Sequence, residues 1–230
     1  MQYCILLLET LYDITMHTIL LYNPLQHIRG KEMKNLFVLW RQVLKNPRGL
    51  GTIAPSSPYL AKAVADAAAI THDHYVVEIG AGTGPLTEEL STRVHPDKFM
   101  IFEPNLDMAT ILREKYPQFP LHVEYASKLP QICAEKSWAH VDVVVSSIPW
   151  SLLKEKDIEE TIDAVCKVLA PQGKMFTLVY AHAQYFPSSL TLEKKFNQSF
   201  EKVYRTKIVL GNIPPGYFLV GDTPKKTQTT

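Results

Sequence analysis

The most informative segment of the chain is Tyr75-Val-Val-Glu-Ile-Gly-Ala-Gly-Thr-Gly-Pro-Leu-Thr-Glu-Glu-Leu90. Its apolar, β-branched opening predicts a buried parallel strand. Three glycines follow at alternate positions, Gly80, Gly82 and Gly84, and glycine lets a backbone turn sharply and approach a ligand closely. Pro85 suits the first position of a helix. A strand, a glycine turn and a helix in this order place the turn at the carboxyl end of a strand, where α/β sheets bind ligands.

Two kinds of nucleotide site compete for this turn. A dinucleotide site requires G-x-G-x-x-G, whereas here the third glycine comes one residue early and Glu78 has no role. The order E-x-G-x-G-x-G resembles motif I of the class I methyltransferases, which use S-adenosyl-L-methionine (SAM). That resemblance favours SAM over NAD as the cofactor. It implies that the turn binds SAM through Glu78, Gly80, Ala81, Gly82 and Gly84.

Composition limits the possible classes of protein. The chain has 230 residues, of which 46% are hydrophobic, and a net charge of +1. These values suit one soluble α/β domain and argue against a general nucleic-acid surface, which would be strongly basic. The three cysteines are widely spaced and predict neither disulfides nor a zinc site, so we expect no metal and a cytoplasmic protein. No apolar run reaches the ~20 residues that a transmembrane helix needs.

The chain divides into four expected parts. Residues 1–33 are an N-terminal extension, and Met33 is a second candidate for the native start. Residues 34–70 hold an amphipathic helix and a segment that covers the cofactor. The methyltransferase core follows at 71–221, and 222–230 is a polar tail that we expect to be disordered.

The amphipathic helix predicted at 34–45 is a candidate membrane-binding element. Residues 29–48 carry six basic side chains and one acidic side chain. Basic amphipathic helices with aromatic residues can lie in a membrane interface, although the same pattern fits a helix packed on the core with a solvated basic face. The side chains expected to meet an anionic membrane surface are Lys34, Phe37, Trp40, Arg41 and Lys45.

A second resemblance begins at Asn46-Pro-Arg-Gly-Leu-Gly-Thr-Ile-Ala-Pro-Ser-Ser57. This phrase is similar to the N-terminal segment of the bacterial soluble phosphatidylethanolamine N-methyltransferases, a family similar in plan to the ribosomal RNA adenine dimethylases. In both groups this segment folds over the cofactor, which implies contacts from Ser56 and Ser57. Ser57 is also a plausible N-cap, with Pro58 at the first position, for a helix at 58–69.

The next two strands are expected to complete the cofactor site. Residues 98–103 predict a strand ending in Glu103, whose carboxylate can accept both ribose hydroxyls of an adenosyl group. Pro104 then leads into a helix that ends at about Lys115. Strand three is expected at 121–125. Methyltransferases usually place an adenine-binding aspartate just beyond it, whereas this chain has Ala126 and Ser127, so Ser127 or the backbone could substitute.

The exit of the predicted fourth strand, Ser147-Ile-Pro-Trp150, corresponds to motif IV. Adenine N6-methyltransferases have Asn or Asp where this chain has Ser147, and the phospholipid enzymes have a phrase more like this one. We expect Ser147 beside the cofactor and Pro149 and Trp150 beside the acceptor. The carbonyl of Ile148 is a candidate to orient the acceptor amine.

The end of the fifth strand supplies the remaining candidates. A helix is predicted at 158–169 and a strand at 174–180, followed by three side chains that could meet the acceptor: Tyr180, His182 and Tyr185. The two tyrosine hydroxyls could orient the amine, and His182 could accept its proton. Residues 203–210 and 217–220 predict a final antiparallel pair. The expected fold is therefore α/β, a single Rossmann-like, seven-stranded class I methyltransferase sheet with helices on both faces and an N-terminal helical extension.

The resemblance extends over residues 34–221 and implies SAM-dependent N-methylation of phosphatidylethanolamine by a peripheral membrane enzyme. Its expected partners are the phospholipid substrate and an anionic membrane surface, with no specific nucleic acid. Three alternatives stay open: an RNA or DNA adenine methyltransferase, a small-molecule methyltransferase, and an inactive SAM-binding protein.

Overall fold

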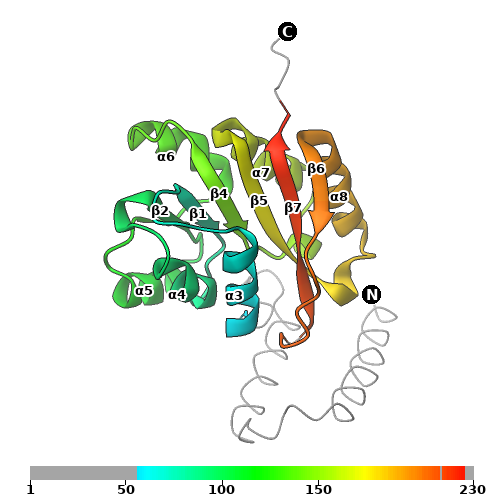
Figure 1. Ribbon diagram of the computed structural model, residues 1–230, viewed down its shortest axis with the longest axis horizontal. Helices are drawn as coiled ribbons and strands as arrows, with labels where there is room; N and C mark the ends of the chain where they lie inside the picture. The colour runs from blue at the N-terminus through cyan, green and yellow to red at the C-terminus, as the bar shows by residue number, and fades with distance from the viewer. Residues whose placement is uncertain (1–55, 213, 226–230) are drawn as a thin grey trace, which may run out of the picture. The chain divides into compact units, whose positions relative to one another are not determined.

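The structure is a computed structural model that describes residues 56–212 and 214–225. The predicted N-terminal extension, the helix at 34–45 with its five membrane candidates, and residues 226–230 lie outside the described residues. Figure 1 shows the described part as a twisted sheet flanked by helices.

The sheet has seven strands in the order β3-β2-β1-β4-β5-β7-β6. The first five strands run parallel, and β7 pairs antiparallel with both β5 and β6. This arrangement confirms the predicted fold class. The strands are β1 (Val76–Ile79), β2 (Phe99–Phe102), β3 (Leu121–His122), β4 (Val141–Ser146), β5 (Leu169–Tyr180), β6 (Phe200–Arg205) and β7 (Gly216–Pro224).

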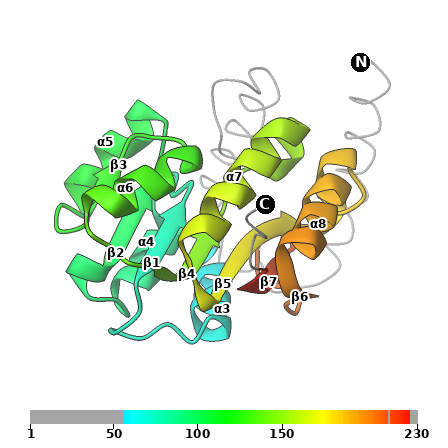
Figure 2. The same ribbon diagram turned by 90° about the horizontal axis from the view of Figure 1, so that it is seen from above.

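Helices cover both faces of the sheet, as Figure 2 shows for α3 on one side and for α7 and α8 on the other. The α-helices are α3 (Pro58–Ala67), α4 (Pro85–Ser91), α5 (Leu106–Lys115), α6 (Leu129–Glu135), α7 (Glu155–Val168) and α8 (Pro187–Ser199). Four short 3-10 helices join them: η1 (Pro96–Lys98), η2 (Ala126–Lys128), η3 (Trp150–Leu152) and η4 (Ala181–Ala183).

Side chains alternate between the two faces of the sheet, so the core has two layers. Val143 and Val145 of β4 face the layer that holds α3, α4 and α5, whereas Val144 faces the layer that holds α6, α7 and α8. Successive side chains of a strand point to opposite faces, so a strand buried on both faces is apolar throughout. The apolar run at 141–145, broken only by Asp142, therefore indicates a central strand.

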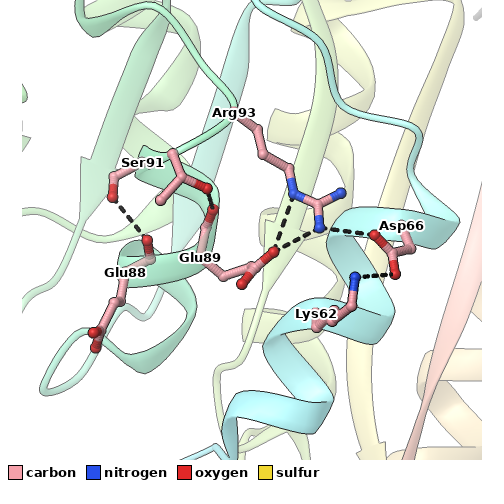
Figure 3. A network of polar contacts seen from close by, with 7 residues as sticks. Lys62, Asp66, Glu88, Glu89, Ser91 and Arg93 are labelled. Atoms are coloured by element: carbon pink, nitrogen blue, oxygen red, sulfur yellow. Dashed lines mark hydrogen bonds and ion pairs between the residues drawn. The ribbon is translucent and has the colours of Figure 1, made fainter.

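Helix α3 is capped as its sequence predicts and is anchored by polar contacts that the sequence analysis did not predict. The Ser57 hydroxyl accepts a hydrogen bond from the Leu60 N–H (3.3 Å), and Pro58 takes the first position. Near the other end of α3, Arg93 contacts both Asp66 (2.7 Å) and Glu89 of α4 (2.6 Å). Figure 3 shows this network, in which Lys62 also reaches Asp66. The network fixes the C-terminal half of α3 against α4.

The structure corrects three expectations for the second half of the chain. Helices α6 and α8 were not predicted. Strand β6 begins at Phe200, which is buried, rather than at 203, and it ends at Arg205 rather than at 210. Strand β7 continues to Pro224, so the first three residues of the expected tail belong to the sheet. The extension has a physical cause, because Asp222 pairs in register with Lys202 and Lys174 and contacts the Lys174 ammonium at 3.3 Å.

Candidate active site

A cavity of about 730 Å³ lies at the carboxyl ends of β1, β2, β4 and β5. Parallel strands end together at one edge of the sheet, so residues far apart in the sequence converge there. The cavity brings together eleven of the predicted site residues: Ser56, Gly80, Ala81, Gly82, Glu103, Pro104, Ser127, Ser147, Ile148, Pro149 and Tyr180.

The glycine turn needs its glycines for two different reasons. All three have positive φ, with Gly80 at 76° and Gly84 at 91°. A Cβ on Gly80 would lie 2.5 Å from the Ile148 side chain, so Gly80 lets the β4 exit approach the turn. A Cβ on Gly84 would lie 2.8 Å from the Tyr116 ring. Gly84 therefore serves the packing of α4 on α5 and does not line the cavity.

Glu78 lies beneath the turn, fully buried in β1. Its Oε2 accepts a hydrogen bond from the Thr87 hydroxyl (2.7 Å), whereas Oε1 has no partner among the described residues. Burial raises the pKa of this carboxyl to about 8, and the nearby Glu103 adds to the effect. Glu78 is therefore predominantly protonated at neutral pH and supports the turn from behind, rather than lining the cavity.

Glu103 links the first two strand ends. Its carboxylate accepts hydrogen bonds from the N–H groups of Gly82 (2.8 Å) and Asn105 (2.9 Å). Each carboxylate oxygen can accept a second hydrogen bond, so the group still has capacity for a hydroxyl of a ligand. Asn105 in turn caps α5 by accepting from Asp107 and Met108.

Ser147 joins the β4 exit to the glycine turn. Its hydroxyl donates to the Gly80 carbonyl (2.6 Å), and its N–H donates to the Ile79 carbonyl (3.0 Å). The Ile148 carbonyl, predicted to orient an amine, already accepts the Trp150 N–H at 2.9 Å. These hydrogen bonds fix the backbone that follows β4 where it lines the cavity.

The predicted acceptor residues are not all brought together. Tyr180 lines the cavity, and burial raises the pKa of its hydroxyl to about 12. Trp150, by contrast, is 3% exposed, lies in the α7/α8 core layer, and borders only a small recess beside the cavity. Tyr185 is 79% exposed and lies outside the lining. His182 belongs to η4 at the same edge, but its side chain lies outside the described part of the structure. Ser57 is the N-cap of α3 and does not line the cavity.

The cavity also contains acidic residues that the sequence analysis missed. Glu124 follows β3, and Asp157 and Glu160 project from the first two turns of α7. Thr161 and the exposed Tyr125 lie with them. On an amphipathic helix such carboxylates look like part of a solvated face, so the residue pattern alone gave no signal. Together with Glu103 they give the cavity a negative lining.

Comparison with known proteins identifies the family. A family model described as a methyltransferase domain matches residues 76–173. An ornithine lipid N-methyltransferase of Singulisphaera acidiphila is 32% identical over 145 residues, which cover 61% of this chain and 76% of that protein. The chain belongs to the class I SAM-dependent methyltransferases.

Two further comparisons, one of sequence and one of structure, also match methyltransferases. Ribosomal RNA small subunit methyltransferase A of Thermotoga maritima is 32% identical over 133 residues, covering 56% of this chain but only 46% of that protein. A solved methyltransferase structure from Streptococcus mutans, in complex with SAH, matches with a TM-score of 0.51 at 15% identity and covers 71% of this chain and 93% of that one. At that identity the likeness concerns the fold alone.

SAM is the cofactor, and the residues present fit it. SAM carries a sulfonium and an ammonium group, which suit the negative lining. The turn at Gly80 and Gly82 brings bare backbone to the cavity, and Glu103 has acceptor capacity left for hydroxyl groups. Among the described residues, no group of three or more His, Cys, Asp or Glu side chains could hold a metal ion, and no helix is long and apolar enough to cross a membrane.

Proposed function

We propose that this methyltransferase transfers methyl groups to the amine of phosphatidylethanolamine at a membrane surface. The observation that carries the proposal is a set of exposed apolar side chains on the segments that adjoin the cavity lining, which we call the apolar rim: Tyr59, Leu152, Tyr185, Phe186, Leu190, Ile208 and Leu210. All seven are solvent-accessible, and Tyr185 and Leu210 are more than three-quarters exposed. Leu152 also lines the cavity itself, and Tyr59 and Tyr185 follow closely after the lining residues Ser56 and Tyr180.

Two of the rim segments, 181–192 and 206–216, carry almost no charge. Lys207 is the single Lys, Arg, Asp or Glu residue in 181–192 and 206–216 together. Nucleic-acid affinity depends on neutralising phosphates with Lys and Arg, so this edge is poorly suited to RNA. Exposed aromatic and leucine side chains instead suit insertion among lipid chains, where burying apolar area contributes roughly 25 cal/mol per Å².

A second candidate function is adenine methylation of ribosomal RNA, which the Thermotoga relative favours. Against it stand the weakly charged rim and Ser147. The Ser147 hydroxyl is engaged with the Gly80 carbonyl, where an adenine enzyme would present an amide or carboxylate. The ornithine lipid enzyme, by contrast, matches over three-quarters of its length and acts on an aminolipid by its name.

The mechanism assigns separate tasks to the residues of the cavity. SAM supplies an electrophilic methyl group. The acidic lining attracts cationic groups, including a protonated lipid amine. Tyr180 can hold the amine by hydrogen bonding but cannot remove its proton at neutral pH, because its own pKa is about 12. The proton therefore leaves to another base, such as water, His182 or a carboxylate of the lining, and the enzyme contributes by positioning and desolvating the neutral amine.

The test is a transfer assay with radiolabelled SAM. Its four arms contain vesicles of phosphatidylethanolamine with an anionic lipid, matched vesicles of phosphatidylcholine, small-subunit ribosomal RNA, and no acceptor. We expect label in the first lipid only, because the nitrogen of phosphatidylcholine already carries three methyl groups and cannot accept another. Labelling of the RNA arm alone would replace the proposal with the second candidate, and label in neither would leave a small-molecule acceptor.

A further inference from the structure

The segment that enters α3 is held by a residue near the other end of the chain. The N–H of Ser57 donates to Oδ1 of Asn212 at 2.7 Å, across 155 positions of sequence. Asn212 is 1% exposed, and its Nδ2 donates to the Pro214 carbonyl at 2.6 Å. Both ends of the amide are thus used, which fixes its orientation.

The loop that carries Asn212 also contacts the first turn of α3 and the residue that follows β5. A Cβ on Gly211 would lie 3.0 Å from the Tyr59 ring, so the loop packs closely on the first turn of α3. The Pro215 carbonyl accepts the N–H of Ala181, which directly follows Tyr180. The loop between β6 and β7 therefore contacts the chain next to Ser56 on one side and next to Tyr180 on the other, and both residues line the cavity.

We propose that Asn212 is a positioning residue for SAM binding, which acts by holding the Ser56–Ser57 segment in place at the cavity. Asn212 itself does not line the cavity. Ser56 does, and the N–H of the next residue is the group that Asn212 holds. Without this bond the segment keeps its covalent attachment to α3 but loses its hydrogen bond to the loop between β6 and β7. The proposal concerns cofactor binding alone and does not depend on which acceptor is methylated.

The first test measures binding of SAH to the full chain by calorimetry, with no acceptor present. We expect Asn212→Ala to raise the dissociation constant about tenfold, because SAH must then order a segment that has lost one well-made hydrogen bond. Arg93→Met is the matched control, because it removes the contact that anchors α3 at its far end. We expect it to lower the melting temperature while leaving the dissociation constant within twofold.

A second pair of variants tests the same bond from its other side. Ser57→Pro removes the donor N–H, and the φ of −72° at this position suits proline. Ser57→Ala keeps that N–H and removes the N-cap hydroxyl. We expect Ser57→Pro to weaken SAH binding clearly more than Ser57→Ala does. The double variant of Ser57→Pro with Asn212→Ala should bind no more weakly than the worse single variant, because both remove one interaction.

Three results would overturn the proposal. The first is an unchanged dissociation constant in a folded Asn212→Ala protein, which would make Asn212 a stabiliser of the fold alone. The second is a Ser57→Pro effect equal to that of Ser57→Ala. The third is a double variant whose losses multiply to about hundredfold, since independent effects add in free energy.

Discussion

The carboxyl of Glu78 shows how one buried group can make the stability of this enzyme depend on pH. Its pKa is about 8 in the folded protein, against an ordinary value of 4.5. Between these two values the unfolded chain has lost the proton and the folded chain has kept it. Stability therefore falls as the pH rises through this window, by up to ~1.4 kcal/mol per pH unit, and becomes level above pH 8.

Replacing Glu78 by glutamine should remove this dependence. The amide oxygen can still accept from Thr87, but nothing titrates. We expect the difference in unfolding free energy between Glu78→Gln and the wild type to grow steadily from pH 5 to pH 8 in favour of the variant, as measured by urea denaturation of the cofactor-free protein. Parallel pH profiles for the two proteins would show that the buried carboxyl is not protonated in the folded state.

Tyr180 is the residue whose hydroxyl we expect to matter for turnover. Removing it in Tyr180→Phe leaves the ring in the cavity wall, so SAH affinity should stay within twofold while kcat falls about tenfold. Because the pKa of the hydroxyl is about 12, the shape of the pH–rate profile below pH 10 should not change. Steady-state kinetics would measure kcat and its pH dependence, and calorimetry would measure SAH affinity. If kcat keeps its wild-type value, Tyr180 only packs against the core.

At the scale of elements, the rim makes the clearest prediction. Tyr185→Ser, Leu190→Ser and Leu210→Ser combined should reduce co-sedimentation with phospholipid vesicles at least fivefold, because three exposed apolar side chains would no longer insert. Ile111→Ser with Tyr204→Ser is the control. These two residues, on α5 and on β6, are also exposed, at 44% and 43%, although less than the three rim residues, and neither belongs to the rim. Equal loss in both variants would mean that the rim has no special role at a membrane.

Local features of the sequence predicted the elements that build the cofactor side of the site. The glycine spacing, Pro85 and the acid at the end of β2 act within a few residues, so they can be recognised without tertiary information. The position of Trp150 could not be recognised in this way. Its place after β4 suggested the cavity, but η3 packs against α8, a helix that was not predicted, and the indole is buried there. The tie between Ser57 and Asn212 was equally hidden, because it joins distant parts of the chain.

At the scale of the molecule, the last strand is not an edge. Strand β7 lies between β5 and β6, as the red arrow between yellow and orange strands shows in Figure 1. Within the described sheet, β6 pairs with β7 and with no other strand. An unpaired strand edge is a template for association with other chains. Strand β6 is therefore the edge strand at this end of the sheet, and residues 216–224 cover the inner edges of β5 and β6.

This arrangement has a consequence for the newly made chain. During synthesis the glycine turn and the first five strands emerge from the ribosome well before β7. These five strands can therefore pair with one another while synthesis continues. The β6–β7 hairpin docks only afterwards, and with it Asn212 reaches Ser57. A chain halted before residue 216 would carry most of the cofactor-contacting groups, yet it would leave β5 open on one side and β6 without a partner strand. The late step that covers the inner edges of the sheet therefore also forms the bond between Asn212 and Ser57, so we expect an incomplete copy of the enzyme to bind the methyl donor more weakly.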